Sequence, residues 1–160
     1  HNIDYMKNTI SFNTKFGWVS ATEIDNKITK ILFQKEKNRG RLTKNLKNLK
    51  KFFKNFLTSK KNKINLTISM IGKNQQKRVW RELKKIKFGN TKTYGDIGKK
   101  LKISPRYVGR ICGENKHIIY IPCHRVIKSD GSLGGFSAPS GVRLKRRLLE
   151  FEKNFNSSYS

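Results

Sequence analysis

The sequence predicts an α+β fold in two lobes: a small N-terminal lobe with an antiparallel sheet and a helix, and a mainly helical C-terminal lobe. Two observations carry this prediction. Before residue 72, segments of alternating apolar and polar residues flank one segment of helical period, whereas later apolar residues recur mainly at helical spacing. We expect lobes at 1–72 and 73–153, followed by a disordered tail over 154–160.

The N-terminal lobe begins with two predicted strands, 9–19 and 27–33, joined by a hairpin turn at Asp25-Asn26. Residues 41–57 follow with helical period. Residues 64–70 alternate strictly, which predicts a half-buried strand. No pattern of catalytic residues is present in this lobe. The apolar stripe of the helix consists of Leu42, Leu46, Leu49, Phe52, Phe53 and Phe56.

The C-terminal lobe begins with a helix from about residue 74 that Gly89 ends. A second, short helix begins after Thr93, which can cap it together with Asp96 three residues on. Ser104-Pro105 supplies an N-cap and a first-turn proline for a third helix, through about residue 112. Two short helices separated by a tight turn, the second one basic, are typical of a helix-turn-helix.

The rest of the lobe is predicted to be extended and then helical. Residues 117–121 form a short β-rich run that leads into Pro122-Cys123-His124-Arg125-Val126. Glycines over 131–135 mark a loop, and a last helix begins near Ser140.

The charge is strongly unbalanced, with 37 Lys and Arg against 10 Asp and Glu, a formal net charge of +27. Such a field attracts polyanions, and nucleic acid is the first candidate. A compositional bias toward Lys and Asn would raise the charge in the same way, so both explanations stay open. No run of 18 apolar residues occurs, and residues 1–7 lack the apolar core of an export signal.

The two cysteines, Cys112 and Cys123, form no CxxC pair, and no zinc-like ligand spacing occurs. We therefore expect reduced thiols in an intracellular protein. Only a thiolate is a good nucleophile, and an ordinary thiol pKa of about 8.5 leaves little thiolate at neutral pH. The imidazole of His124 and the cation of Arg125 can favour deprotonation of Cys123. The alternative is a buried structural cysteine beside an unrelated histidine.

Ile121-Pro122-Cys123-His124-Arg125-Val126-Ile127 resembles the active-site signature of the O6-alkylguanine-DNA alkyltransferases. The resemblance is strong over residues 75–152 and weak over the first 70. It also includes Thr93-Tyr94-Gly95-Asp96-Ile97, Ser104-Pro105-Arg106-Tyr107-Val108-Gly109, Asn115, Gly135-Phe136-Ser137 and Lys145-Arg146-Arg147-Leu148-Leu149.

This resemblance implies an irreversible, single-turnover transfer of a methyl or other alkyl group from O6 of guanine in double-stranded DNA to Cys123. His124 would relay the thiol proton through water to a glutamate. We prefer Glu152 to Glu150, because the loop at 138–140 is about two residues longer than the usual family pattern. Tyr94 would help rotate the nucleotide and donate a hydrogen bond to the base, and Asn115 would brace the turn before the cysteine.

The lesion is inaccessible inside a duplex, so the nucleotide must be extruded. The resemblance implies that Arg106 fills the vacated space from the minor groove; a phosphate contact is its alternative role. The residues expected to contact DNA are Arg106, Tyr94, Thr93, Ser104, Tyr107, Arg110 and Arg125. Those expected around the alkyl group are Cys112, Phe136, Ser137 and Pro122.

Two departures from the family pattern stand out, Lys116 in place of a proline and Phe136 in place of a tyrosine. Because the first lobe lacks the zinc ligands of some relatives, we expect no metal, and the chemistry needs no organic cofactor. We expect a monomer without membrane contact, located in the cytoplasm of a bacterium or archaeon or in a eukaryotic nucleus. Neither the preferred alkyl size nor activity on O4-alkylthymine is predicted.

Three alternative functions differ in what they require. A lesion-sensing protein without catalysis would bind alkylated DNA and leave Cys123 unmodified. A transcription factor of helix-turn-helix type would recognise one DNA sequence and dimerise. A cysteine hydrolase would need a base on a distant histidine, and no suitable one is recognisable.

Overall fold

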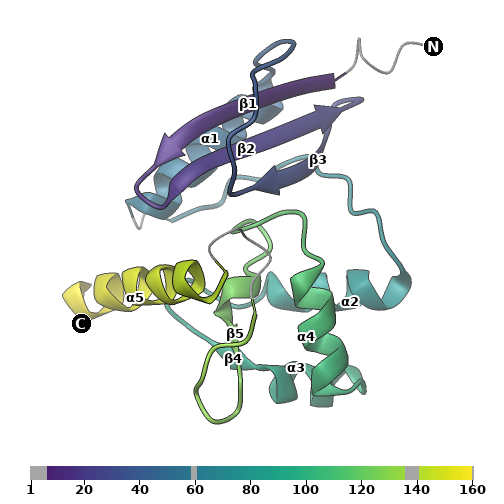
Figure 1. Cartoon of the computed structure of the whole chain (residues 1–160), viewed down its shortest axis with the longest axis vertical. Helices are drawn as coiled ribbons and strands as arrows, with labels where there is room; N and C mark the ends of the chain where they lie inside the picture. Colours follow the sequence, from purple (N-terminus) through teal and green to yellow (C-terminus); the bar gives the residue numbers. More distant parts are fainter. Residues whose placement is uncertain (1–6, 59–60, 136–140, 160) are drawn as a thin grey trace. The chain divides into compact units, whose positions relative to one another are not determined.

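The sheet of the N-terminal lobe has three antiparallel strands in the order β1-β2-β3: Lys7–Thr14, Gly17–Ile24 and Lys27–Leu32 (Figure 1). The structure, a computed structural model, describes residues 7–58, 61–135 and 141–159, and only the backbone from 156 on. The chain divides into two compact units, His1–Ile71 and Gly72–Ser160. The predicted α+β class is confirmed.

The two hairpin turns of this sheet differ in how well the sequence signals them. Asp25 and Asn26 both have positive φ, 54° and 65°, as a two-residue turn between twisted strands requires, so the predicted hairpin is confirmed. The prediction of a single strand over 9–19 is wrong, because a tight turn separates β1 from β2. In that turn, Thr14 Oγ1 donates to Gly17 O at 2.8 Å and accepts from Phe16 N at 3.1 Å.

Helix α1, Lys44–Leu57, lies behind the sheet in Figure 1. Thr43 caps it by accepting a hydrogen bond from Leu46 N at 3.2 Å. The rings of Phe12 and Phe53 meet edge to face with centroids 5.5 Å apart, which joins the helix to the sheet. The buried stripe of the helix consists of Leu46, Leu49, Phe52, Phe53 and Phe56, as predicted except for exposed Leu42.

The alternating segment 64–70 is extended but is not a regular strand. It forms a single parallel bridge between Ile68 and Ile28, through bonds from Ile28 N to Thr67 O and from Ser69 N to Ile28 O. Leu66 is buried, so the alternation correctly indicated one apolar face. The strand prediction fails because only one residue of the segment pairs with β3.

The C-terminal lobe contains four α-helices in its described part: α2 Asn74–Leu83, α3 Tyr94–Leu101, α4 Pro105–Gly113 and α5 Gly141–Tyr159. Strands β4, Lys92–Thr93, and β5, Val126–Ile127, pair in parallel. Helix α2 ends at Leu83, earlier than the predicted stop at Gly89, and the chain continues through turns to Ile86. No helix in the described ranges is both long and apolar enough to cross a membrane.

Helices α3 and α4 form the predicted helix-turn-helix. Thr93 and Asp96 form the capping box of α3, and Ser104 caps α4 by accepting from Tyr107 N at 3.1 Å. The turn is tight at Gly98, where a Cβ would lie 2.6 Å from Ile103 O. Glycine is therefore required at this close approach.

The structure differs from the expected disordered tail over 154–160, because α5 continues to Tyr159. Phe155 packs edge to face on Phe151, with centroids 4.8 Å apart, and on Phe88 at 6.4 Å. This aromatic cluster extends the apolar face of the helix beyond the polar residues that suggested a tail.

Candidate active site

The chain reaches the cysteine through a tight turn, not through the β-rich strand predicted for 117–121. Tyr120 N bonds to Ile118 O at 2.8 Å, and Ile121 N bonds to His117 O at 2.9 Å. Buried Ile119 has a φ of +69°, a conformation that costs a β-branched residue about 1–3 kcal/mol. Packing around the turn must therefore hold the backbone that leads into the 3-10 turn Cys123–Arg125.

Asn115 joins the end of α4 to the thiol. Its Oδ1 accepts from His117 N at 2.9 Å; because a backbone N–H can only donate, this bond fixes the orientation of the amide. The opposite Nδ2 donates to Ile121 O at 2.8 Å and to Cys123 Sγ at 3.1 Å. The amide thus braces the turn, as expected for Asn115, and also presents a donor to the sulfur.

His124 forms a buried pair with Glu152 of α5, with 2.5 Å between Nε2 and Oε2. Both side chains are almost completely buried, whereas Glu150 is exposed. Of the two carboxylates left open by the sequence, the structure places Glu152 beside the histidine. A histidine whose Nε2 donates to a carboxylate carries its lone pair on Nδ1, which makes Nδ1 the proton-accepting atom.

Glu152 also binds Arg125 and the backbone of Gly89. Arg125 Nε lies 2.8 Å from Oε1 and 3.1 Å from Oε2, and Gly89 N donates to Oε1 at 2.8 Å. Arg125 Nη1 donates to Ile86 O at 2.8 Å, and the residue is only 9% exposed. The expected contact of Arg125 with DNA is therefore corrected: its guanidinium is committed to an interior ion pair.

These contacts set the protonation states of the pair. Burial lowers the pKa of His124, against the opposing effect of Glu152. Burial acts to raise the pKa of Glu152, but the hydrogen bonds and charges of His124 and Arg125 outweigh it and lower that pKa to about 2. At neutral pH the site therefore combines a neutral imidazole with an ionised carboxylate.

Lys145 is a site residue that the sequence analysis missed. Its side chain is fully buried, and Nζ lies 3.0 Å from Tyr94 OH and 3.4 Å from Gly135 O. Burial lowers the pKa of Lys145, and burial raises the pKa of Tyr94, with nearby Cys112 and Cys123 adding to the latter. The available signal was a lysine on the same helical stripe as buried Leu144 and Leu148.

Tyr94 also lines a cavity of about 400 Å³ against the helix-turn-helix, a volume in the range of ligand pockets. Arg106, the second residue of α4, is exposed at this cavity. Among the described residues, the lining comprises Tyr94, Gly95, Pro105, Arg106, Gly109, Lys128, Ser129, Gly134 and Gly135. Cys123 is 2% exposed, so its sulfur lies inside the lobe and not at the surface.

The other expected residues fall into three groups. Thr93 and Ser104 act as helix caps, and Arg110 lies over the ring of Tyr107 at 5.8 Å on the same helix. Two expected pocket residues, Cys112 and Pro122, are buried, and burial raises the pKa of Cys112. The remaining two, Phe136 and Ser137, lie outside the described residues.

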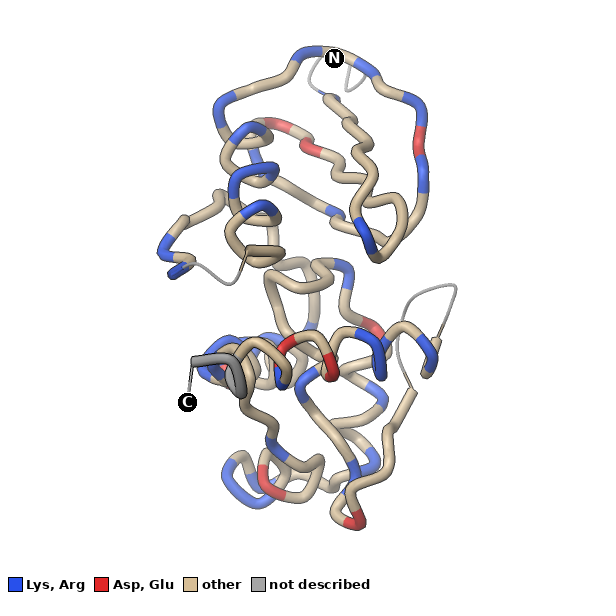
Figure 2. The backbone as a smooth tube through the Cα atoms, turned by 90° about the vertical axis from the view of Figure 1, so that its left-hand side faces the viewer, with Lys and Arg blue, Asp and Glu red and all other residues tan. Residues whose placement is uncertain are grey.

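Positive charge does not by itself mark the site. Figure 2 shows Lys and Arg along both units of the chain, with few Asp and Glu among them. The site is instead defined by its enclosed Cys, His, Glu, Asn, Tyr and Lys side chains. Among the described residues, no group of three or more His, Cys, Asp or Glu side chains could hold a metal ion.

A helix-turn-helix and a buried cysteine, histidine and glutamate lie in one lobe, an arrangement typical of a nucleic-acid-binding fold with an enclosed cysteine site. The sequence profile of the family described as 6-O-methylguanine DNA methyltransferase, DNA binding domain, matches residues 74–154. The chain belongs to this family.

Individual relatives agree. The methylated-DNA–protein-cysteine methyltransferase of Sulfolobus acidocaldarius is 42% identical over 100 residues, 62% of this chain but only 63% of that protein. The Methanosarcina mazei protein of the same name is 31% identical over 133 residues, 78% of this chain and 83% of that protein. The crystal structure of the Mycobacterium tuberculosis O6-methylguanine methyltransferase superposes with a TM-score of 0.81 at 24% identity, covering 93% of this chain and 94% of that one, which shows the fold.

Proposed function

We propose that this chain repairs DNA by irreversible transfer of a methyl or other alkyl group from O6 of guanine to Cys123, once per molecule. Family membership supports the class of reaction. The observation that carries the proposal is the enclosed thiol, which accepts a hydrogen bond from Asn115 and neighbours the His124–Glu152 pair.

The proposed reaction starts with removal of the thiol proton. His124 accepts it at Nδ1 through a bridging water, and the ionised carboxylate of Glu152 stabilises the imidazolium that forms. Arg125 and Gly89 N hold that carboxylate in place. A neutral histidine can act in this way at pH 7, which agrees with the lowered pKa of His124.

The thiolate then attacks the alkyl carbon. A sulfur–carbon bond forms as the bond between that carbon and O6 breaks, and its electron pair goes to the purine. The proton that left the thiol ends on guanine, so the products are S-alkylcysteine and unmodified guanine. We propose that Tyr94 donates a hydrogen bond to the departing base. A phenol is protonated at neutral pH, and burial raises the pKa of Tyr94 further.

The substrate must leave the helical stack before this step. We propose that the target nucleotide enters beside Tyr94 while Arg106 occupies its former place in double-stranded DNA. The exposed position of Arg106 at the cavity supports this role. We further propose that the chain acts as a monomer in the compartment that holds the genome, since one lobe supplies all the residues invoked.

Intact-protein mass after incubation with a short duplex carrying O6-methylguanine tests the proposal. We expect a gain of one methyl group, never more than one per molecule, and no gain for Cys123→Ala. If the wild-type protein binds the duplex without gaining mass, the alternative of a lesion sensor without catalysis is correct instead.

A further inference from the structure

The face of the N-terminal sheet opposite α1 carries hydroxyl groups where apolar residues would be expected in a core. Thr9, Ser20 and Thr22 lie on this face and are only 6%, 3% and 6% exposed. Thr9 and Thr22 are cross-strand partners whose Oγ1 atoms lie 3.5 Å apart. A polar surface of this kind can hold a ligand that accepts and donates hydrogen bonds.

The segment 33–43 between β3 and α1, here called the strap, forms one wall over this face. Thr9 and Arg39 exchange backbone hydrogen bonds of 2.8 and 2.9 Å, so the strap pairs with β1. Ser11 Oγ donates to Glu36 O and accepts from Glu36 N, both at 2.7 Å. Ser11 N donates to Asn38 Oδ1 at 2.9 Å. The wall is therefore fixed by several bonds to one strand.

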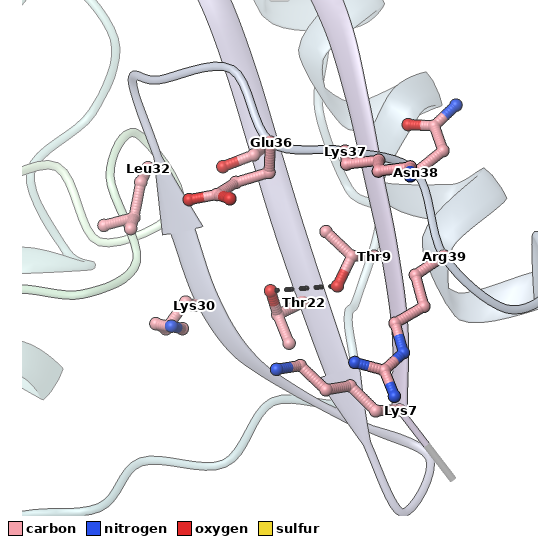
Figure 3. A pocket seen from close by; sticks show the side chains of 10 residues that line it. Lys7, Thr9, Thr22, Lys30, Leu32, Glu36, Lys37, Asn38 and Arg39 are labelled. Carbon is pink, nitrogen blue, oxygen red and sulfur yellow. Dashed lines mark hydrogen bonds between the residues drawn. The ribbon is translucent and has the colours of Figure 1, made fainter. Parts of the chain in front are cut away.

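The strap and the sheet enclose a cavity of about 420 Å³ with a strongly positive lining. Figure 3 shows Lys7 and Arg39 reaching over the strands toward Thr22, with Lys30 on its other side. Lys37 adds a further cation, and Glu36 is the single carboxylate among the described lining residues. Glu36 accepts a bond from Gln34 Nε2 at 2.6 Å. The described residues that line the cavity are Lys7, Thr9, Ser20, Thr22, Lys30, Leu32, Glu36, Lys37, Asn38 and Arg39.

Lysines are abundant throughout this chain, so their number alone indicates nothing. The arrangement is informative, because these cations come from β1, β3 and the strap and surround one hydroxyl-lined hollow. Like charges gathered in this way repel one another unless an anion lies between them. Charged donors and hydroxyls together provide the charge-assisted hydrogen bonds that phosphate oxygens accept.

We propose that this cavity is a second binding site, specific for a ligand with at least two linked phosphate groups. The inference concerns the N-terminal unit alone and does not rest on the alkyl-transfer function. The same chemistry is offered by a free oligophosphate, such as the phosphate chain of a nucleotide, and by consecutive phosphates of a nucleic-acid strand.

Calorimetric titration of the 160-residue chain with inorganic pyrophosphate tests the site. We expect binding that weakens at least roughly tenfold in the double variant Lys7→Gln/Arg39→Gln, which loses two charge-assisted contacts. The matched control is Lys47→Gln/Lys51→Gln, which removes two exposed charges from α1 of the same lobe and should change affinity less than about twofold. Equal losses in both variants, or no binding to the wild-type protein, would overturn the proposal.

Thr22→Val provides a test at constant charge. It keeps the branched shape and removes the hydroxyl, and we expect pyrophosphate to bind roughly fivefold more weakly, the effect of one lost hydrogen bond. Thermal unfolding of each variant verifies that the lobe is folded. Unchanged affinity in a folded Thr22→Val protein would mean that the cations attract anions without a built site, and the proposal would fail.

Competition distinguishes the two sources of phosphate. The amide signal of Thr22 in nuclear magnetic resonance spectra reports on the cavity, far in sequence from the helix-turn-helix. If a nucleic-acid strand occupies the cavity, a short oligonucleotide displaces pyrophosphate there, also in an Arg106→Ala protein. If the ligand is a free oligophosphate, ATP displaces pyrophosphate and the oligonucleotide does not.

Discussion

The ammonium group of Lys145 donates a hydrogen bond to the hydroxyl oxygen of Tyr94, 3.0 Å away, inside the C-terminal lobe. Because that oxygen accepts from the lysine, the hydroxyl proton of Tyr94 is directed elsewhere. An extruded base is the partner that the proposed reaction offers. Removing the charge of Lys145 from water carries a large penalty, which its hydrogen bonds to Tyr94 and Gly135 offset only in part. We therefore regard Lys145 as a positioning residue that acts through Tyr94.

Lys145→Met is expected to slow alkyl transfer roughly tenfold or more while leaving thermal stability equal or higher, since a buried charge is replaced by an apolar chain. Single-turnover kinetics with a lesion duplex measure the rate. Arg146→Met, at the exposed neighbouring position, is the control and should react at the wild-type rate. If Lys145 acts through Tyr94, adding Lys145→Met to Tyr94→Phe causes little further loss; additive losses would contradict this role.

Asn115→Ala is expected to impair both stability and transfer. The substitution removes the donor to Ile121 O and Cys123 Sγ and the acceptor of His117 N. Loss of these buried hydrogen bonds costs about 1–3 kcal/mol. Chemical denaturation measures the first effect and single-turnover kinetics the second. A protein with full transfer rate and lowered stability would show that the amide braces the turn only.

Arg106→Ala should separate extrusion of the nucleotide from the chemistry. Arg106 is exposed at the cavity and lies outside the buried group of Cys123 and the His124–Glu152 pair. Transfer from a free O6-alkylguanine base should therefore proceed at the wild-type rate. Transfer from a duplex should slow roughly tenfold or more, because unstacking costs a few kcal/mol. Arg110→Ala, further along α4, serves as the comparison. If Arg106 only binds phosphate, saturating duplex will restore the rate of the Arg106 variant.

Local signals predicted much of this fold. Helix caps at Thr93 and Ser104 and the turn at Asp25-Asn26 act within a few residues, so the sequence displays them directly. The turn between β1 and β2 was missed because Lys15-Phe16 contains none of the usual turn residues. The left-handed conformation of Ile119 gives no sequence signal, since tertiary packing must impose it on a β-branched residue.

The site was predictable only in part, because several of its contacts join residues that are far apart in the sequence. Cys123 and His124 stand in a recognisable motif, but Glu152 reaches them from another helix, and spacing alone did not choose between it and Glu150. Arg125 illustrates why sequence alone was insufficient. In a basic chain, an arginine beside a thiol is expected to contact DNA, yet Arg125 forms an ion pair with Glu152 that exists only in the folded lobe. Lys145 was hidden within a run of basic residues.

Stability should fall on acidification in two stages, because both members of the buried pair have lowered pKa values. His124 takes up a proton near pH 6.5 when unfolded but only at lower pH when folded, so the unfolded state binds more protons as pH falls below about 6.5. Glu152 takes up a proton near pH 4.3 when unfolded but near 2 when folded, so its contribution is lost as pH falls from about 4.3 toward 2.

The unfolding temperature, measured from about pH 8 down to about pH 3, should therefore decline with a second, steeper phase below about pH 4.5. Glu152→Gln removes the carboxylate and should flatten that phase while lowering stability at neutral pH, because it breaks the ion pair with Arg125. The matched variant Glu150→Gln changes an exposed carboxylate two residues away and should retain the wild-type profile. Parallel profiles for the wild type and Glu152→Gln would mean that other carboxylates control the acid limb, and that the buried pair does not store the stability inferred from its geometry.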